Sequence, residues 1–145
     1  MLNREAIADL VPQKGAMCLL DSVENWSADR ILCRAETHLS AANPLRHSGR
    51  LGIFNGCEYG LQAAALHGAL SAGGEARRPG YLAALRVTRI GCAYLDDASI
   101  GALLVEAVME AATASGLIYG FTLAAARGDV LLQGRGTIKL PDSIS

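Results

Sequence analysis

Residues 51–72 read LGIFNGCEYGLQAAALHGALSA, and this stretch decides the fold. Nearly every position is apolar or small, and Gly56, Gly60 and Gly68 lie among alanines. Each glycine costs an isolated helix about 1 kcal/mol, so glycines are expected here if the helix lies close against another backbone. A helix that is apolar on all sides is a buried helix. The stretch therefore predicts one long helix in the core, wrapped by a sheet.

The segments on both sides of this helix predict strands. Before it, residues 17–23 form a short apolar run, and residues 29–37 alternate between apolar and charged side chains, as in a half-buried strand. After it, turn signals separate four candidate strands, which are Tyr81–Ile90, Leu103–Met109, Leu117–Leu123 and Val130–Leu140. The alanines of residues 103–114 would also suit a helix, but the apolar side chains alternate and favour a strand. We expect these four strands to form a meander.

The rest of the chain completes a single domain, residues 1–145. A short amphipathic helix is predicted over residues 3–11, with Asn3 as its N-cap. Residues 40–50 and 71–80 are typical of irregular loops, and no repeat, low-complexity tract or linker is present. Antiparallel strands curled around one buried helix belong to the α+β class.

Composition excludes several classes of function. The chain has 145 residues, of which 51% are hydrophobic and 19% charged, as in a folded domain. A formal net charge of -1, without any run of lysine or arginine, argues against nucleic-acid binding. No apolar run approaches the roughly 20 residues of a membrane span, and the N-terminus does not resemble a secretory signal. We therefore expect a cytoplasmic protein, with widely spaced cysteines that are small buried hydrophobes (Cys18, Cys33, Cys57 and Cys92).

Glu58 is the most informative polar residue of the chain. It lies about two turns into the predicted helix, which is otherwise apolar around it. A carboxylate is rarely buried without a partner, because removing its charge from water costs several kcal/mol. Burial raises the pKa of a carboxyl group towards neutrality, where it can exchange protons with a substrate. We predict that Glu58 is catalytic; the structural alternatives are that it bonds a neighbouring backbone group or points outwards at a subunit boundary.

Two further polar residues lie on the same helix. Gln62 is four residues after Glu58 and shares its face, where it either binds substrate or is a satisfied core glutamine. His67 is nine residues after Glu58 and half a turn out of phase, so the two cannot form a dyad within one straight helix. We expect His67 to be a satisfied core or interface histidine.

The loop before the helix carries the other candidates. His47 is either a catalytic group or an exposed loop histidine, and Arg50 beside it is a candidate substrate contact. Backbone amides ahead of a helix can polarise a carbonyl, and Gly49 and Gly52 would let a substrate approach them. His38, at a strand end, is a weaker third candidate and is expected to be a solvated residue. The sequence has no Ser/His/Asp arrangement, phosphate loop, dinucleotide fingerprint or metal-ligand spacing.

Several of these residues carry a resemblance to a known family. The stretch NPLRHSGRL at residues 43–51, followed by Glu58-Tyr59 and Gln62-Ala63, resembles the hot-dog 3-hydroxyacyl-acyl-carrier-protein dehydratases. It is most similar to their small branch associated with aryl polyene and related lipid pathways. PQKG at residues 12–15 resembles the family's opening motif, and GYL at residues 80–82 resembles the start of its later strand block. The resemblance covers nearly the whole chain.

This resemblance implies a hot-dog fold, in which an antiparallel sheet wraps around one long helix. It also implies a homodimer, or a higher oligomer, with active sites at the subunit boundary where a histidine faces a carboxylate from the other subunit. Glu58 falls on the carboxylate position. Asn43, before a proline, fits the place of the family histidine better than His47 does, and it cannot act as a base. Gln13 replaces a histidine common in the opening motif.

The leading hypothesis is dehydration of a 3-hydroxyacyl thioester to the trans-2-enoyl product. Glu58 would transfer a proton at the hydroxyl, His47 would act at the α-carbon, and amides of residues 49–52 would hold the carbonyl. The substrate would be carried on phosphopantetheine, as acyl carrier protein or acyl-CoA, with no other cofactor. Two alternatives are thioester hydrolysis and a non-catalytic module that binds acyl carrier protein through basic residues (Arg46, Arg50, Arg77 and Arg78).

Overall fold

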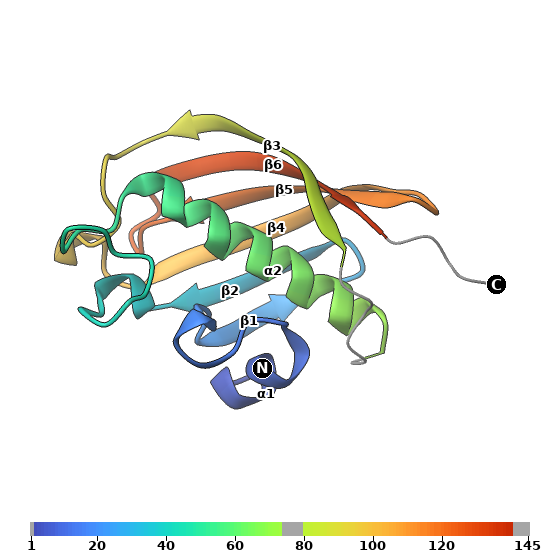
Figure 1. The fold of residues 1–145 in the computed structure, drawn as a ribbon, viewed down its shortest axis with the longest axis horizontal. Helices are drawn as coiled ribbons and strands as arrows, with labels where there is room; N and C mark the ends of the chain where they lie inside the picture. The colour runs from blue at the N-terminus through green and yellow to red at the C-terminus, as the bar shows by residue number, and fades with distance from the viewer. Residues whose placement is uncertain (1, 74–79, 141–145) are drawn as a thin grey trace.

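The computed structural model describes residues 2–73 and 80–140 and forms one six-stranded antiparallel sheet with a long helix lying across it (Figure 1). The strand order is β1-β2-β4-β5-β6-β3. The helices are α1 (Arg4–Leu10) and α2 (Gly56–Ser71), and the strands are β1 (Ser22–Trp26), β2 (Arg30–Ala35), β3 (Tyr81–Ile90), β4 (Leu103–Ala112), β5 (Gly116–Ala124) and β6 (Val130–Lys139). The predicted α+β architecture, a sheet wrapped around one buried helix, is confirmed.

Most of the predicted elements are present near their expected bounds. Asn3 caps α1 as predicted, because its side-chain oxygen accepts a hydrogen bond from the amide of Ala6 at 3.0 Å. Residues 103–112 form a strand, as their alternation indicates, and not a helix. The alternation in β2 is also confirmed, since Ile31, Cys33 and Ala35 are fully buried.

The strand predicted over residues 17–23 is wrong for most of its length. Residues 15–17 form a 3-10 turn, and β1 begins only at Ser22. Leu19 and Leu20 are buried and apolar as a strand would be, but their amides donate to the side-chain oxygen of Gln62, at 2.7 and 3.3 Å. A glutamine on α2 thus takes the place of a neighbouring strand as their hydrogen-bond acceptor.

The predicted meander is only partly correct. Strands β4, β5 and β6 do follow one another as antiparallel neighbours, but β3 pairs with β6 and lies at the sheet edge. The connection from β3 to β4 instead runs past the start of α2, where the amide of Ile53 donates to Ala93 and that of Leu95 donates to Leu51. These two hydrogen bonds anchor the crossover and separate β3 from β4.

The central helix begins later than predicted. Residues 53–55 form a 3-10 turn, and regular α-helix starts at Gly56 and ends at Ser71, so the predicted start at residue 51 was five residues early. Glu58 consequently lies in the first turn of α2 and not two turns into it. The carboxylate is therefore close to the helix N-terminus, where the helix dipole favours negative charge.

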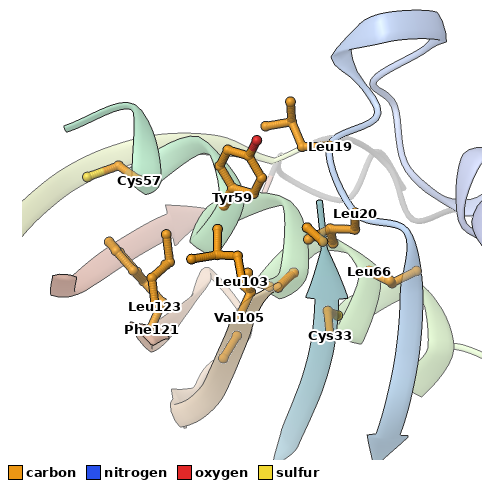
Figure 2. Close-up of a cluster of buried hydrophobic side chains, with 14 of the residues drawn as sticks. Leu19, Leu20, Cys33, Cys57, Tyr59, Leu66, Leu103, Val105, Phe121 and Leu123 are labelled. Atoms are coloured by element: carbon orange, nitrogen blue, oxygen red, sulfur yellow. The ribbon is translucent and has the colours of Figure 1, made fainter. Parts of the chain in front are cut away.

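Helix α2 packs closely on the concave face of the sheet. Figure 2 shows Tyr59 and Leu66 of the helix among Leu103, Val105 and Leu123 of the strands, and these side chains are almost fully buried. A methyl group at Gly60 would overlap the ring of Phe121 on β5, and one at Gly56 would lie 2.8 Å from Leu132. The two glycines therefore allow the close approach to the sheet that the sequence predicts.

We expect Gly60→Ala to destabilise the protein. Alanine improves helix propensity by about 1 kcal/mol, but overpacking a rigid core costs about 1–3 kcal/mol, and the overlapping atoms include the Cβ of Phe121. The net effect should be a lower midpoint in chemical denaturation. Gly52→Ala is the control, because its methyl would meet only Asn55 at 3.8 Å. An equal midpoint for Gly60→Ala and wild type would show that the helix can move away from the sheet.

Candidate active site

A groove of about 520 Å³ runs along one face of α2. The helix contributes Glu58, Leu61, Ala65 and Gly68, which recur at the spacing of one helix face. The opposite wall comes from residues 9–14, which form the end of α1 and the segment after it, and from the ends of β3, β5 and β6. From residue 58 to residue 69 the helix rises roughly 16 Å, at about 1.5 Å per residue. The small helix residues leave an elongated, mainly apolar channel with a carboxylate at one end.

Glu58 lies in this groove but is exposed in the single subunit. The prediction from the sequence that Glu58 is buried is therefore wrong for the single subunit. The reason is that α2 is not apolar all round, since its Glu58 face is turned away from the sheet and towards the groove. Exposure at the groove agrees with the alternative in which Glu58 points outwards at a subunit boundary.

Gln62 shares the Glu58 face by sequence but is buried, with 1% of its surface exposed. Its side-chain oxygen accepts hydrogen bonds from Leu19 and Leu20, and its nitrogen donates to the carbonyl oxygen of Met17 at 2.9 Å. Both ends of the amide are therefore engaged by backbone. This is the satisfied core glutamine that the sequence left open, and it fixes residues 17–20 against α2.

Asn43 is buried in a chain of hydrogen bonds that reaches α2. Its side-chain nitrogen donates to the hydroxyl oxygen of Tyr59 at 3.0 Å and to the carbonyl of Thr37 at 2.9 Å. The Thr37 hydroxyl donates to the Leu19 carbonyl at 2.6 Å, so the Tyr59 hydroxyl, 2.8 Å away, donates to Thr37. Burial raises the pKa of Tyr59, partly offset by its hydrogen bonds to Thr37 and Asn43. The network holds the loop of residues 37–43 to the helix.

His47 is exposed and lies in a turn that precedes α2 in the chain. Its backbone pairs with Arg50 in both directions, at 2.8 and 3.0 Å. Ser48 and Gly49 at the tip both have positive φ, 51° and 76°, as in a tight hairpin turn. The amide of Arg50 is taken by this turn, so it is not available to hold a substrate carbonyl as expected for residues 49–52.

Arg46 and Arg50 converge on Asp96, which lies in the crossover between β3 and β4. Their guanidinium groups are 3.2 and 2.9 Å from one carboxylate oxygen. Arg50 also stacks on the ring of Tyr94, 3.8 Å from its centroid. The hydrogen bond from Arg50 is the main cause that lowers the pKa of Asp96. Arg46 and Arg50, two of the candidate contacts for an acyl carrier protein, are thus paired with Asp96 within the subunit, while Arg77 and Arg78 lie outside the described residues.

The other two histidines are both buried. His67 is satisfied as predicted, because its Nε2 donates to the Ser27 carbonyl at 2.9 Å and its Nδ1 accepts from the Tyr119 hydroxyl at 2.7 Å. His38 was expected to be solvated, and this is wrong, since it is fully buried. Its Nε2 donates to the carbonyl of Gly101 at 2.8 Å, and its Nδ1 has no partner within the described residues.

His38 predicts a loss of stability in mild acid. Burial lowers the pKa of His38 in the folded protein, against a weaker opposing effect of the Gly101 carbonyl. The unfolded chain, with an ordinary histidine pKa of about 6.5, therefore binds the proton more readily. The contribution of neutral His38 to stability is therefore present above the pKa of the unfolded chain. It is lost as the pH falls towards the lower pKa of His38 in the folded protein. The urea concentration at the midpoint of unfolding should therefore decrease as the pH is lowered below about 6.5. This decrease should be smaller in His38→Gln. An equal dependence of the midpoint on pH in the variant and in wild type would contradict the assignment to His38.

The sequence analysis did not identify residues 9–14 as part of the site, although they form one wall of the groove. Gln13 and Lys14 of the opening motif line the groove together with Glu58. The signal available in the sequence was Pro12, which ends α1 and leaves the next residues in irregular structure. The second group that was missed is Asp96, whose pairing with two arginines depends on the crossover.

The cysteines do not offer a nucleophile. Burial raises the pKa of all four thiols, that of Cys33 to about 12. Across residues 2–73 and 80–140 no group of three or more His, Cys, Asp or Glu side chains is placed to hold a metal ion. In the same residues, no helix combines the length and apolar character required to cross a membrane.

Comparisons with solved structures show the same fold throughout. The dehydratase heterocomplex ApeI:P from Xenorhabdus doucetiae matches with a TM-score of 0.76 at 18% identity, over 99% of this chain and 93% of that one. Zebra fish thioesterase superfamily member 2 matches with a TM-score of 0.67 at 17% identity, over 95% and 93%. A hypothetical thioesterase with coenzyme A from Streptococcus pneumoniae matches with a TM-score of 0.61 at 12% identity, over 86% and 88%. The fold is thus the hot-dog fold that the resemblance implied.

A search of the curated proteins found no match to this sequence. The model of the ApeP-like family, described as ApeP dehydratase, matches residues 5–144. That span includes the groove, Glu58 and the loop of residues 43–51. The chain therefore belongs to the ApeP-like dehydratase family and is a hot-dog hydro-lyase that dehydrates 3-hydroxyacyl thioesters.

Proposed function

We propose that this dehydratase acts on 3-hydroxyacyl groups carried by acyl carrier protein, with Glu58 as the group that protonates the departing hydroxyl. The observation that supports this most strongly is the position of Glu58 at one end of a mainly apolar groove along α2. A carboxylic acid of this kind can donate a proton to a leaving oxygen. The apolar remainder of the groove fits an acyl chain.

The length of the groove favours a chain of medium length. Its span of roughly 16 Å along the helix accommodates on the order of ten carbons, since each carbon–carbon bond of about 1.5 Å advances an extended chain by somewhat less than its own length. Ala65 and Gly68 lie in the half of this wall away from Glu58 and have little side chain to obstruct it.

We propose a dimer that joins two subunits through their β3 strands. β3 is a sheet edge, and it exposes large apolar side chains over its whole length (Tyr81, Leu82, Leu85 and Ile90). Unpaired edge strands with apolar side chains are templates for pairing with another chain. Pairing of two such edges would continue the sheet across the dimer and cover the exposed face of α2. The ApeI:P structure is a heterocomplex, so a second subunit of a different sequence is the alternative partner.

The second proton-transfer group is proposed to be His47 of the other subunit. His67 is engaged at both ring nitrogens and His38 is buried away from the groove, whereas His47 is exposed at the N-terminal end of α2. Asn43, at the place of the family histidine, is held by Tyr59 and Thr37 and cannot accept the α-proton. The elimination transfers one proton from the α-carbon and one to the hydroxyl. It involves no change of redox state, so we propose that it needs no cofactor beyond phosphopantetheine.

A second candidate function is thioester hydrolysis. The observation in its favour is that zebra fish and Streptococcus pneumoniae thioesterases share the fold. In that case Glu58 would activate water or attack the thioester directly. A module that only binds the carrier protein is the third candidate, supported by Asn43 in place of a histidine.

Intact-mass spectrometry of a 3-hydroxyacyl carrier protein separates these three functions. Incubation with the wild-type protein should remove one water from the acyl carrier, for chains of medium length. Loss of the whole acyl group would support the hydrolase. An unchanged mass across short and long chains, combined with saturable binding, would support the binding module and contradict the dehydratase.

A further inference from the structure

Two arginines of β3 differ from the other arginines of the chain. Arg86 and Arg89 are exposed, and neither forms an ion pair or a side-chain hydrogen bond within residues 2–73 and 80–140. Every other arginine in these residues pairs with a carboxylate (Arg4, Arg30, Arg34, Arg46, Arg50, Arg127 and Arg135). The arginine charge that is open to a partner is therefore concentrated on β3.

Both arginines lie on the outer face of the sheet, the face away from α2. Arg86 is the register partner of Arg135 on β6, and Arg89 is the partner of Gln133. Gly136 faces inwards, because a methyl group there would meet a side chain of α2. Neighbouring residues of a strand point to opposite faces, so Arg135, Gln133 and their partners on β3 share the outer face. β3 is the outermost strand on this side of the sheet (Figure 1).

The pairing of Arg86 with Arg135 is unfavourable in the isolated subunit. Like charges directly opposite each other on neighbouring strands destabilise a sheet. Glu110 accepts two hydrogen bonds from the guanidinium group of Arg135 and offsets its charge. Arg86 and Arg89 remain uncompensated, and Lys139 is exposed on the same face. An acidic partner on this face would relieve the repulsion.

A polar hollow of about 290 Å³ adjoins these arginines. The register of β3 with β6 shifts at Thr88, which is an extra residue in the strand. The lining of the hollow consists largely of polar residues of β3, β4, β5 and β6 (among them Thr88, Glu110, Thr122, Gln133 and Arg135). Hydroxyl, amide and guanidinium groups donate hydrogen bonds to carboxylates. The outer face thus combines unpaired positive charge with a hollow suited to acidic side chains.

The strand that carries these arginines also lines the groove, through Gly80 and Leu82. A methyl group at Gly136 would lie 2.9 Å from Leu61 and 3.5 Å from Leu82, so these two leucines lie close together. Leu61 is about one helical turn after Glu58. The start of β3 therefore borders the groove near Glu58. A phosphopantetheine arm, roughly 18 Å long when extended at about 1.5 Å per bond, can pass around this end of the strand.

We propose that the outer face of β3 is the docking surface for the acyl carrier protein, with Arg86 and Arg89 as its main charged contacts. This inference rests on the proposed function, in which a carrier protein presents the substrate. An acidic carrier complements the unpaired charge on this face. Arg46 and Arg50 are less suited to the task, because Asp96 already holds both.

The proposed dimer leaves this surface accessible. Edge strands pair through their backbone groups, and side chains on the outer face point away from the plane of the sheet. Pairing of two β3 strands would place Arg86 and Arg89 of both subunits side by side on one outer face. One dimer would thus present a continuous basic band to its carrier proteins.

The test compares one 3-hydroxyacyl group on two carriers, acyl carrier protein and pantetheine alone. Enoyl product is measured for wild type and for the double variant Arg86→Gln/Arg89→Gln. The variant should raise KM for the carrier-protein substrate about tenfold, the upper end for two exposed charge contacts, and leave kcat unchanged. KM for the pantetheine substrate should stay at the wild-type value, because pantetheine has no acidic surface. Added salt should raise the wild-type KM for the carrier-protein substrate as well.

Two further double variants serve as controls. Arg34→Gln/Arg127→Gln removes the same charge from arginines that are paired with Glu36 and Asp129, and it should keep the wild-type KM for both substrates. Arg86→Lys/Arg89→Lys keeps the charge of the docking surface and should retain most of the wild-type KM for the carrier-protein substrate.

Two outcomes would overturn the proposal. One is a wild-type KM for the carrier-protein substrate in Arg86→Gln/Arg89→Gln. The other is an equal rise of KM for both substrates, which would place the effect in the groove or in the fold. Calorimetric binding of the carrier protein without an acyl group tests the surface independently of turnover, and it should weaken by the same factor in the variant. The docking surface and the proposed reaction can therefore fail separately.

Discussion

Glu58→Gln should lower kcat/KM for dehydration by at least about a hundredfold, the lower end of what a positioned general acid contributes. Glutamine keeps the size of the side chain and removes the proton that the hydroxyl needs in order to leave as water. Glu58 is exposed at the groove, and within residues 2–73 and 80–140 its carboxylate forms no hydrogen bond or ion pair, so the variant should fold and melt close to wild type. The rate is measured from the appearance of enoyl product by intact mass.

The matched control for this variant is Glu36→Gln. Glu36 is an exposed carboxylate that pairs with Arg34 at 3.5 Å, and it is not among the residues that line the groove. It should retain wild-type turnover. Full turnover by a correctly folded Glu58→Gln protein would remove Glu58 from the reaction and would require another acid in its place.

Leu85→Lys should convert the proposed dimer to monomer and lower activity by more than about tenfold. Leu85 is 43% exposed at the middle of the β3 edge, where two copies would meet. Lysine on an edge strand is a common natural obstacle to strand pairing. Activity should fall together with dimerisation because the proposed site combines Glu58 with a group from the other subunit. Analytical ultracentrifugation and turnover are measured on the same preparation.

Asn25→Lys provides the control at the opposite edge of the sheet. Asn25 is exposed on β1, the strand at the other end of the order. The variant should remain dimeric and active. A monomeric wild-type protein with full activity would contradict a site shared between subunits, and a dimer that survives Leu85→Lys would place the interface elsewhere.

The sequence predicted the core of this fold well, because that core depends on local patterns. A run of small residues with inner glycines led to a helix in close contact with a sheet, and Gly60 against Phe121 is the contact that explains it. The period of two in residues 103–112 outweighed their alanine content. In both cases the side chains that determine the pattern are those that touch the neighbouring element.

The errors arise where distant segments meet. Residues 17–21 resemble a strand, but Gln62 supplies their acceptor from another part of the chain. The position of β3 beside β6 depends on a crossover anchored at Leu51 and Ile53, which no local pattern reveals. The exposure of Glu58 has a similar cause, since the sequence shows an apolar helix but not which of its faces remains open to a groove.

The candidate site was predicted in part. Glu58 was identified from its apolar surroundings, and it does lie at the groove. The partners of Asn43, Arg46 and Arg50 could not be predicted, because Tyr59 and Asp96 reach them only through the folded loops. The residues that line the other wall, including Gln13, follow a helix end and carry no periodic signal.

The most direct test of the central claim is a structure with a 3-hydroxyalkyl pantetheine thioether bound. The account predicts that the alkyl chain lies along α2 past Ala65 and Gly68, with the hydroxyl oxygen within hydrogen-bond distance of the Glu58 carboxyl group. A ligand bound elsewhere, or one whose hydroxyl points away from Glu58, would contradict the account.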